Sequence, residues 1–137
     1  MDLASTIRDI KDFPQKGIIF RDITTLLINP EAMKESIDRI AEGLKDLEFD
    51  YVLGAESRGF IFGVPVAYKL NKGFIPVRKP GKLPAKTLKK EYALEYGTST
   101  IEIHADALKP GDKVVIIDDL IATGGTSKAM TELAEEM

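Results

Sequence analysis

Two adjacent carboxylates and a glycine-rich turn form the part of the sequence that is best suited to chemistry. Asp118 and Asp119 follow an apolar run, and the sequence Thr-Gly-Gly-Thr occupies residues 123–126. Such glycines allow a sharp turn in which backbone N–H groups converge on an anion, and a helix that begins there adds the positive end of its dipole. A phosphate would fit this turn, whereas the carboxylates would repel it unless sugar hydroxyls or a metal ion lay between. The combination suggests a phosphorylated sugar as the ligand.

Local chemistry leaves a second interpretation of this turn open. Gly and Thr also serve ordinary turns and helix caps, so residues 123–126 could be only a turn before a capped helix. One class of phosphate site is excluded, because no lysine follows the second glycine directly and the P-loop pattern of NTPases is therefore absent.

The elements around this run predict an α/β fold. Residues 114–117 are all β-branched and apolar, which is typical of a strand buried on both faces of a parallel sheet, and residues 127–136 have the composition of a helix. In open parallel sheets ligands bind at the carboxyl ends of the strands, so we expect the acidic pair and the glycine turn to face the site. The remaining pattern predicts helices over 2–12, 30–46 and 60–70, and strands over 18–23, 49–55, 73–78 and 98–104.

A second anion site is expected after the strand 49–55. The loop Glu-Ser-Arg-Gly at 56–59 stands between that strand and a helix, and its Arg58 could clamp a pyrophosphate through two parallel hydrogen bonds. By spacing alone, a surface arginine beside a helix-start glycine is an equally good interpretation.

The segment 79–97 is rich in lysine, although the protein has a formal net charge of −3. Pro80 and Pro84 argue against a regular helix in its first half, which favours a mobile flap. A charged run is usually only a solvated face. Lysines beside phosphate sites, however, would suit a flap that closes over a pyrophosphate and excludes water.

Composition narrows the classes of function. The chain has 137 residues, 44% hydrophobic and 30% charged, which predicts one globular domain. The acidic balance gives no support to a nucleic-acid or membrane partner. Cysteine is absent, so no disulfide or thiolate site is possible, and the N-terminus lacks a signal-peptide core, which favours a cytoplasmic location. His104, the only histidine, lies at the end of a predicted strand, where a structural or exposed role is favoured over catalysis.

The run from 114 to 126 closely resembles the phosphoribosyl diphosphate signature of the type I phosphoribosyltransferases, in which a hydrophobic strand precedes Asp-Asp and Ala-Thr-Gly-Gly-Thr. The resemblance places Asp118 and Asp119 at the ribose 2′- and 3′-hydroxyls. It implies that the 5′-phosphate is held by the following loop, in which the candidate ligands are Leu120, Ala122, Thr123, Gly124, Gly125 and Thr126. The loop 56–59 resembles the pyrophosphate loop of the same family, with Arg58 as its cation.

Two further stretches resemble the adenine-specific branch of that family. Residues 13–24 are similar to the hood over the base, which implies that Phe20 lies on the purine face while Ile19 and Arg21 offer main-chain groups to its edge. Residues 78–84 and 92–97 are similar to the catalytic flap. There the resemblance gives substrate contacts to Arg78, Lys79 and Lys82, proton management to Glu95 and a place beside the pyrophosphate to Tyr96.

The resemblance implies a parallel sheet flanked by helices, with a base-binding hood and a mobile catalytic flap in a single domain, 1–137. Family members continue beyond the final helix, whereas this sequence stops at Met137, so we expect the C-terminal strand to be missing. The implied reaction joins adenine and 5-phosphoribosyl 1-diphosphate to give AMP and diphosphate. Mg²⁺, bound through the substrate near Asp118 rather than held directly by the protein, is the implied cofactor, and a homodimer is the implied assembly. Transfer to another purine, or a non-catalytic sensor of phosphoribosyl diphosphate, are the alternatives.

Overall fold

The computed structural model describes residues 2–94, 97–119 and 125–137. Several predicted site residues therefore lie outside the described residues, namely Glu95, Tyr96, Leu120, Ala122, Thr123 and Gly124. The chain divides into two compact units, Met1–Lys45 and Asp46–Met137, and each is described by itself.

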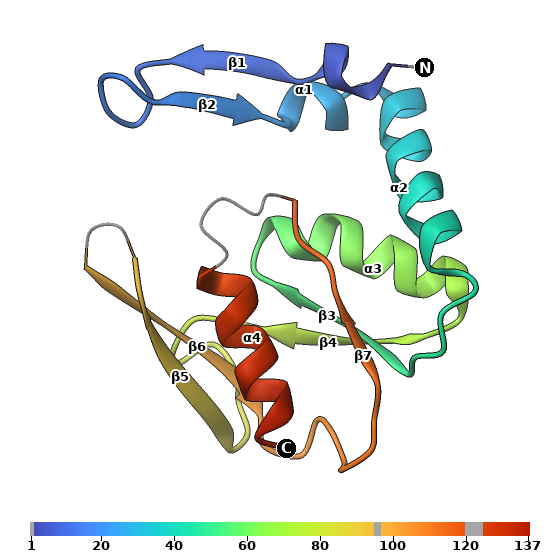
Figure 1. The fold of residues 1–137 in the computed structure, drawn as a ribbon, viewed down its shortest axis with the longest axis vertical. Helices are drawn as coiled ribbons and strands as arrows, with labels where there is room; N and C mark the ends of the chain where they lie inside the picture. The colour runs from blue at the N-terminus through green and yellow to red at the C-terminus, as the bar shows by residue number, and fades with distance from the viewer. Residues whose placement is uncertain (1, 95–96, 120–124) are drawn as a thin grey trace. The chain divides into compact units, whose positions relative to one another are not determined.

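The N-terminal unit contains a β-hairpin and a long helix (Figure 1). Its elements are the 3₁₀ helix η1 (Leu3–Thr6), strands β1 (Arg8–Lys11) and β2 (Ile19–Asp22), and helices α1 (Thr24–Leu27) and α2 (Pro30–Leu44). The prediction of α2 is confirmed. Asn29 caps it by accepting hydrogen bonds from the backbone N–H groups of Glu31 and Ala32, each at 3.1 Å, and Pro30 occupies the first turn.

The predicted helix over residues 2–12 is wrong. Residues Arg8–Lys11 form β1, which pairs with β2 in an antiparallel register that sets Arg8 opposite Asp22 and Asp9 opposite Arg21. Opposite charges that face each other across a strand pair stabilise that register. The strand predicted over 18–23 exists as β2, but it is not a core strand, because Ile18 and Ile19 are 39% and 53% exposed.

The C-terminal unit is built on a parallel sheet with the strand order β4-β3-β7. Its elements are β3 (Tyr51–Ala55), α3 (Arg58–Leu70), β4 (Gly73–Val77), β5 (Thr87–Ala93), β6 (Thr98–His104), β7 (Val114–Ile116) and α4 (Gly125–Glu135). All of these elements were predicted except β5. β4, which contains Pro76, is an edge strand of the three-stranded sheet, where proline is tolerated.

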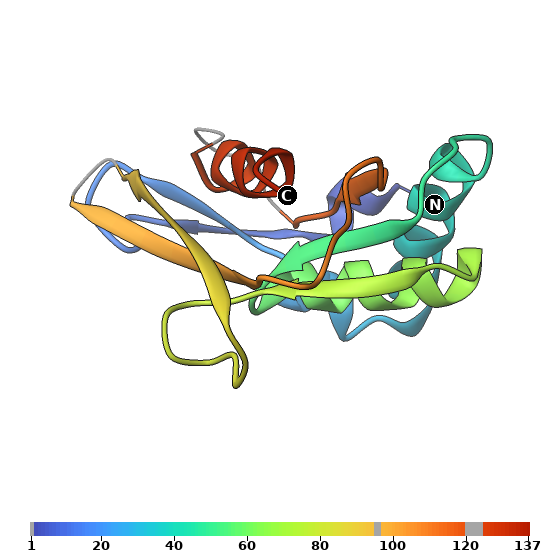
Figure 2. The same ribbon diagram turned by 90° about the horizontal axis from the view of Figure 1, so that it is seen from below.

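Helices α3 and α4 cover opposite faces of the sheet (Figure 2). Leu53 of β3 belongs to the core formed with Met130 and Leu133 of α4, and all three side chains are fully buried. The neighbouring Gly54 faces α3, where a Cβ atom would lie only 2.8 Å from the carbonyl oxygen of Gly59. The absence of a side chain at Gly54 thus lets the start of α3 approach the end of β3.

The burial predicted for residues 114–117 is wrong in part. The strand forms, but Val114, Val115 and Ile116 are half-buried and only Ile117 is buried. In the sheet of the described residues β7 has a neighbour on one side only, and β3 is the central strand.

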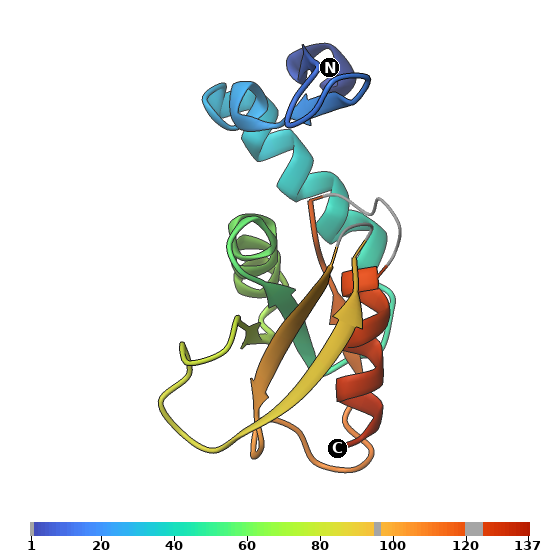
Figure 3. The same ribbon diagram turned by 90° about the vertical axis from the view of Figure 1, so that its left-hand side faces the viewer.

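The lysine-rich segment is an irregular loop followed by a hairpin strand. Residues 79–86 contain no helix, as predicted, and β5 pairs with β6 in an antiparallel hairpin. The hairpin lies alongside α4 (Figure 3), and Lys90 of β5 forms an ion pair with Glu132 of α4 at 3.0 Å. Within the described ranges, no helix is both long and apolar enough to span a membrane.

Candidate active site

A cavity of about 230 Å³ lies where the three parallel strands end. The loops after β3, β4 and β7 line it, together with the hairpin and the first turn of α4. The structure brings together at this cavity six residues that were predicted from the sequence: Arg58, Arg78, Lys79, Asp118, Asp119 and Thr126. A site at the carboxyl ends of the strands agrees with the general rule for open parallel sheets.

Arg58 and Asp119 form an ion pair inside this cavity. Nε of Arg58 lies 3.1 Å from Oδ2 of Asp119, and the Asp119 side chain is only 6% exposed. A buried carboxylate needs a compensating charge, which Arg58 supplies from the first turn of α3. The two predicted ligand contacts are therefore joined to each other by this ion pair.

Asp118 has a more unusual environment than its neighbour. Burial, together with a hydrogen bond to the Asp119 side chain, raises the pKa of Asp118 to about 6. The backbone N–H of Asp119 opposes this effect by donating to Oδ1 of Asp118 at 2.8 Å. Two carboxylates held side by side in this way would be relieved by hydroxyl donors or by a cation.

Glu56 contacts two of the basic residues that line the cavity, Lys79 and Arg78. Its Oε1 accepts a hydrogen bond from the backbone N–H of Lys79 at 2.7 Å and lies 3.3 Å from Nε of Arg78. These contacts lower the pKa of Glu56, with the Lys79 N–H as the largest cause. Lys82 is not among the residues that line the cavity, although its charge contributes to the same shift. Glu56 was not predicted as a site residue; its position one residue after β3 was the available signal.

The hairpin also contributes to the cavity, through two residues that were not predicted as site residues. The hydroxyl of Tyr92 on β5 accepts a hydrogen bond from Oγ1 of Thr126 at 3.1 Å, and Ser99 on β6 is a further lining residue. Tyr92 and Thr126 are far apart in the sequence, so only the folded chain shows their contact. Gly125, the first residue of α4, adjoins this contact.

The residues predicted to contact the base lie in the N-terminal unit. Ile19, Phe20 and Arg21 all belong to β2, and the ring of Phe20 meets that of Phe13 edge-on, with centroids 5.3 Å apart. Arg21 forms an ion pair with Asp9, which raises the pKa of its guanidinium.

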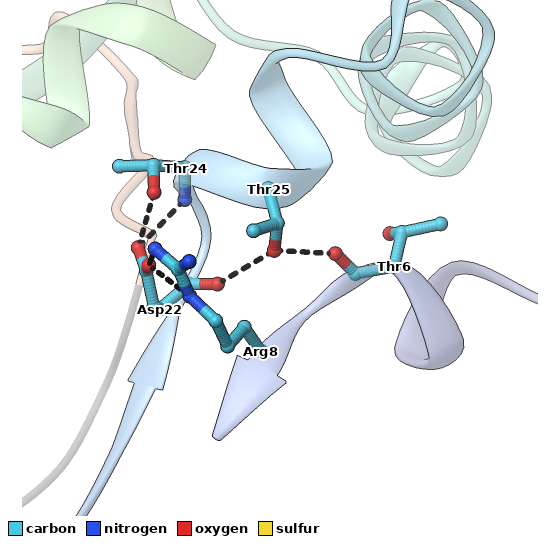
Figure 4. Close-up of polar contacts among 5 residues, drawn as sticks. All are labelled: Thr6, Arg8, Asp22, Thr24 and Thr25. Carbon is cyan, nitrogen blue, oxygen red and sulfur yellow. Dashed lines mark hydrogen bonds and ion pairs between the residues drawn. The ribbon is translucent and has the colours of Figure 1, made fainter. Parts of the chain in front are cut away.

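A polar cluster holds this hairpin to the following helix (Figure 4). Nε of Arg8 donates to Oδ2 of Asp22 at 3.0 Å, while the backbone N–H and the hydroxyl of Thr24 donate to Oδ1 at 2.9 and 2.6 Å. The hydrogen bonds from Thr24 and Arg8 lower the pKa of Asp22 to about 2. The hydroxyl of Thr25 adds a link by donating to the backbone oxygen of Thr6 at 2.6 Å.

A family model described as "Phosphoribosyl transferase domain" matches residues 22–137. The adenine phosphoribosyltransferase of Lachnoclostridium phytofermentans is 62% identical over 98% of this chain and 78% of its own length. The chain belongs to the adenine phosphoribosyltransferase family.

Other relatives and solved structures agree with this family assignment. The enzyme of that name from Thermotoga maritima is 60% identical over the whole chain and 79% of its own length. The crystal structure of adenine phosphoribosyltransferase from Thermoanaerobacter pseudethanolicus has a TM-score of 0.95 at 53% identity, covering 98% of this chain and 78% of that one. The Giardia lamblia structure, described as complexed with 9-deazaadenine, has a TM-score of 0.92 at 42% identity over 98% of this chain and 75% of that one. The predicted family and the predicted α/β fold with a helix-flanked parallel sheet are confirmed, whereas the roles of the individual site residues stay predictions.

A larger cavity, of about 450 Å³, does not have the features of a phosphate site. It lies between the start of β7 and the last turns of α4, at the opposite end of the strands. Its charged lining residues, Lys109, Asp112 and Glu135, include only one cation. His104 lies outside both cavities, and among the described atoms its buried Nε2 has no hydrogen-bond partner.

The donor set at the 230 Å³ cavity fits a hard cation such as Mg²⁺. Asp118 and Asp119 provide carboxylate oxygens there, which Mg²⁺ prefers. In the parts of the chain that the structure describes, no three His, Cys, Asp or Glu residues form a group that could enclose a metal.

Proposed function

We propose that this protein transfers the 5-phosphoribosyl group of 5-phosphoribosyl 1-diphosphate to adenine, giving AMP and diphosphate in purine salvage. One observation carries the proposal: a single cavity combines the cations Arg58, Arg78 and Lys79 with the acidic pair Asp118 and Asp119. The cations suit phosphate groups, and the carboxylates suit the two ribose hydroxyls. Relatives named adenine phosphoribosyltransferase, at 56–62% identity, support adenine as the base.

The chain's own residues would act mainly by stabilising charge. The bond from C1 of the ribose to the diphosphate breaks as positive charge develops on the sugar, so the departing diphosphate needs neutralisation. Arg58, paired with Asp119 at 3.1 Å, and Arg78, 3.3 Å from Glu56, are already held in position at the cavity. Cations fixed in advance require little reorganisation during the reaction.

The remaining roles follow from the resemblance to the family. We assign binding of the 5′-phosphate to the loop 122–126. Phe20 would contact the face of adenine, and Ile19 and Arg21 its edge. Glu95 would manage the proton at the base. Tyr96 would lie beside the diphosphate, and Lys82 would approach it from the loop after β4. Mg²⁺, bound to substrate oxygens near Asp118, would add positive charge to the diphosphate. We also propose a homodimer in the cytoplasm.

The test is to incubate the protein with phosphoribosyl diphosphate, Mg²⁺ and one purine at a time, and to separate the nucleotides by chromatography. We expect AMP from adenine and no comparable product from hypoxanthine, guanine or xanthine. Nucleotide formed from another purine but not from adenine would refute the base assignment. Tight binding of phosphoribosyl diphosphate without turnover of any base would instead favour a sensor.

Arg58→Ala is the informative variant, because it removes a cation from the cavity. Arg39→Ala is the matched control, since Arg39 lies on the N-terminal helix α2 and forms an ion pair with Glu35 there. Loss of turnover in the first variant and not in the second would tie the activity to the cavity.

A further inference from the structure

Glu102 on β6 contacts both ends of the lysine-bearing loop. Its Oε1 accepts a hydrogen bond from the backbone N–H of Gly81 at 2.8 Å, and its Oε2 accepts one from the hydroxyl of Thr87 at 2.8 Å. A single carboxylate thus closes the segment from Gly81 to Thr87, which contains Lys82 and Lys86.

The backbone of Glu102 also forms hydrogen bonds, both of them with Arg78. The N–H of Arg78 donates to the oxygen of Glu102 at 2.9 Å, and the N–H of Glu102 donates to the oxygen of Arg78 at 2.7 Å. This bridge attaches the hairpin to the end of β4, next to the Lys79 that Glu56 holds by its N–H. The start of the basic loop is therefore held by two carboxylates, Glu56 at Lys79 and Glu102 at Gly81.

The side chain of Glu102 has little structural role beyond this loop. Its strand neighbours Ile101 and Ile103 point into the core, where they are 4% and 0% exposed, so the Glu102 side chain lies on the other face of the hairpin. Hydrogen bonds from Thr87 and Gly81 lower the pKa of Glu102, so the carboxylate is ionised at neutral pH and accepts strongly.

We propose that Glu102 is a positioning residue, which holds the loop 79–87 so that Lys79 and Lys82 stand ready for the diphosphate of the substrate. The inference rests on the proposed function for the identity of that ligand. Glu102 does not line the cavity, so it acts through the loop and not by touching the substrate.

The test compares Glu102→Ala with Glu102→Gln and with Glu91→Ala. Alanine removes both acceptors, whereas glutamine keeps an oxygen for the Gly81 N–H and a polar group for the Thr87 hydroxyl. Glu91, exposed on the neighbouring strand β5, controls for the loss of one negative charge from the hairpin. Trypsin cleavage after Lys82 and Lys86 reports how often the loop opens, independently of activity.

We expect Glu102→Ala to raise KM for phosphoribosyl diphosphate about tenfold and to speed cleavage of the loop by a similar factor, because one or two charge-assisted hydrogen bonds are lost. The kcat should change much less, since the lysines bind the diphosphate before and during the reaction. Glu102→Gln, which keeps hydrogen bonds but not their charge, should lie between Glu102→Ala and the wild type, and Glu91→Ala should match the wild type.

Wild-type KM and wild-type cleavage in Glu102→Ala would overturn the proposal. Equal changes in Glu102→Ala and Glu91→Ala would also overturn it, because they would indicate a general charge effect. Should Glu102→Ala fail to fold, Thr87→Val removes one of the two bonds with a residue of nearly the same shape, and unchanged cleavage of that variant would count against the anchor. If the wild type made no AMP, the proposed function would fail, while cleavage and calorimetric binding of phosphoribosyl diphosphate would still decide the role of Glu102.

Discussion

Asp118→Asn should make the protein more stable and at the same time a weaker binder of phosphoribosyl diphosphate. The pKa of Asp118 is raised to about 6 from the usual value of 3.8, so the folded state holds its proton more tightly than the unfolded state does. Its contribution to stability is therefore most favourable at low pH and is lost as pH rises from about 4 through 6. Asparagine cannot ionise and should not show this loss.

The size of the effect follows from the shift and from partial solvent access. Raising the pKa of Asp118 from 3.8 to about 6 corresponds to roughly 3 kcal/mol, but solvent screening at this partly exposed group reduces the effect to about 1–2 kcal/mol. At pH 8 we expect Asp118→Asn to unfold in urea with a free energy higher than that of the wild type by this amount. At pH 4 the two proteins should differ little.

Binding should change in the opposite direction. Between pH 7 and 5 the ionised fraction of a group with this pKa falls to about one-tenth, so wild-type affinity for phosphoribosyl diphosphate with Mg²⁺ should fall about tenfold. In Asp118→Asn this pH dependence should be much weaker. Its affinity at pH 7 should be lower by about 1.5–3 kcal/mol, the value of one charge-assisted hydrogen bond.

The two assays are urea unfolding and isothermal calorimetry across this pH range, and Asp106→Asn, an exposed aspartate of the same unit, is the matched control. Equal free energies of unfolding for Asp118→Asn and the wild type at pH 8 would show that the charge of Asp118 does not destabilise the folded protein. Unchanged affinity at pH 7 would refute its place at the ribose.

Three other predictions concern the acidic pair, Glu95 and the N-terminal hairpin. Changing both Asp118 and Asp119 to Asn should keep the fold, because the side chains are nearly isosteric, yet weaken phosphoribosyl diphosphate binding by ~1.5–3 kcal/mol for each lost contact; calorimetry that gave wild-type affinity would contradict this. Glu95→Gln should lower single-turnover AMP formation by ~10²–10⁴-fold or somewhat less with little change in substrate binding, and a wild-type rate would make the carboxylate dispensable. The pKa of Asp22 is lowered to about 2, so its stabilising contribution is present above about pH 4 and is lost as pH falls through 2. Asp22→Asn should be less stable than the wild type at pH 7 and nearly equal to it at pH 2, as acid unfolding monitored by circular dichroism would show.

Most of the fold could be predicted because its signals are local. The helix α2 follows from Asn29, Pro30 and Glu31 at its start, and the continuous apolar run before Asp118 predicts a strand without any knowledge of its neighbours. The hairpin β1-β2 could not be found in this way. Leu3, Ile7 and Ile10 have helical spacing, but the charges that favour the strand register, Arg8 with Asp22 and Asp9 with Arg21, are distant in sequence and meet only after the chain turns.

For the candidate site too, local features could be predicted from the sequence, whereas contacts between distant residues could not. The order strand, polar loop, helix correctly predicts that Arg58 and Asp119 stand at the ends of parallel strands, and the structure places them at one cavity. This order of elements does not predict the ion pair between Arg58 and Asp119, because the ion pair depends on how α3 packs on the sheet. The close approach of Gly59 to Gly54 brings the first turn of α3 to the carboxyl end of β3. The spacing of apolar residues in the sequence does not predict this approach.

The cavity carboxylates Glu56 and Asp118 and the neighbouring Glu102 differ in their surroundings, and their pKa values are shifted in opposite directions. Glu56 accepts a hydrogen bond from the backbone N–H of Lys79, and Glu102 accepts hydrogen bonds from the Thr87 hydroxyl and the backbone N–H of Gly81; these bonds lower the pKa of each carboxyl. Asp118, buried against the carboxylate of Asp119, has a raised pKa instead. In sequence Glu56 and Asp118 are acidic residues that follow a strand, and Glu102 lies within one, so residue type alone does not distinguish their roles. The difference comes from the hydrogen-bond donors that face each carboxylate. We therefore expect Glu56 and Glu102 to stay ionised at mildly acidic pH, whereas ligand binding at Asp118 should weaken below about pH 6.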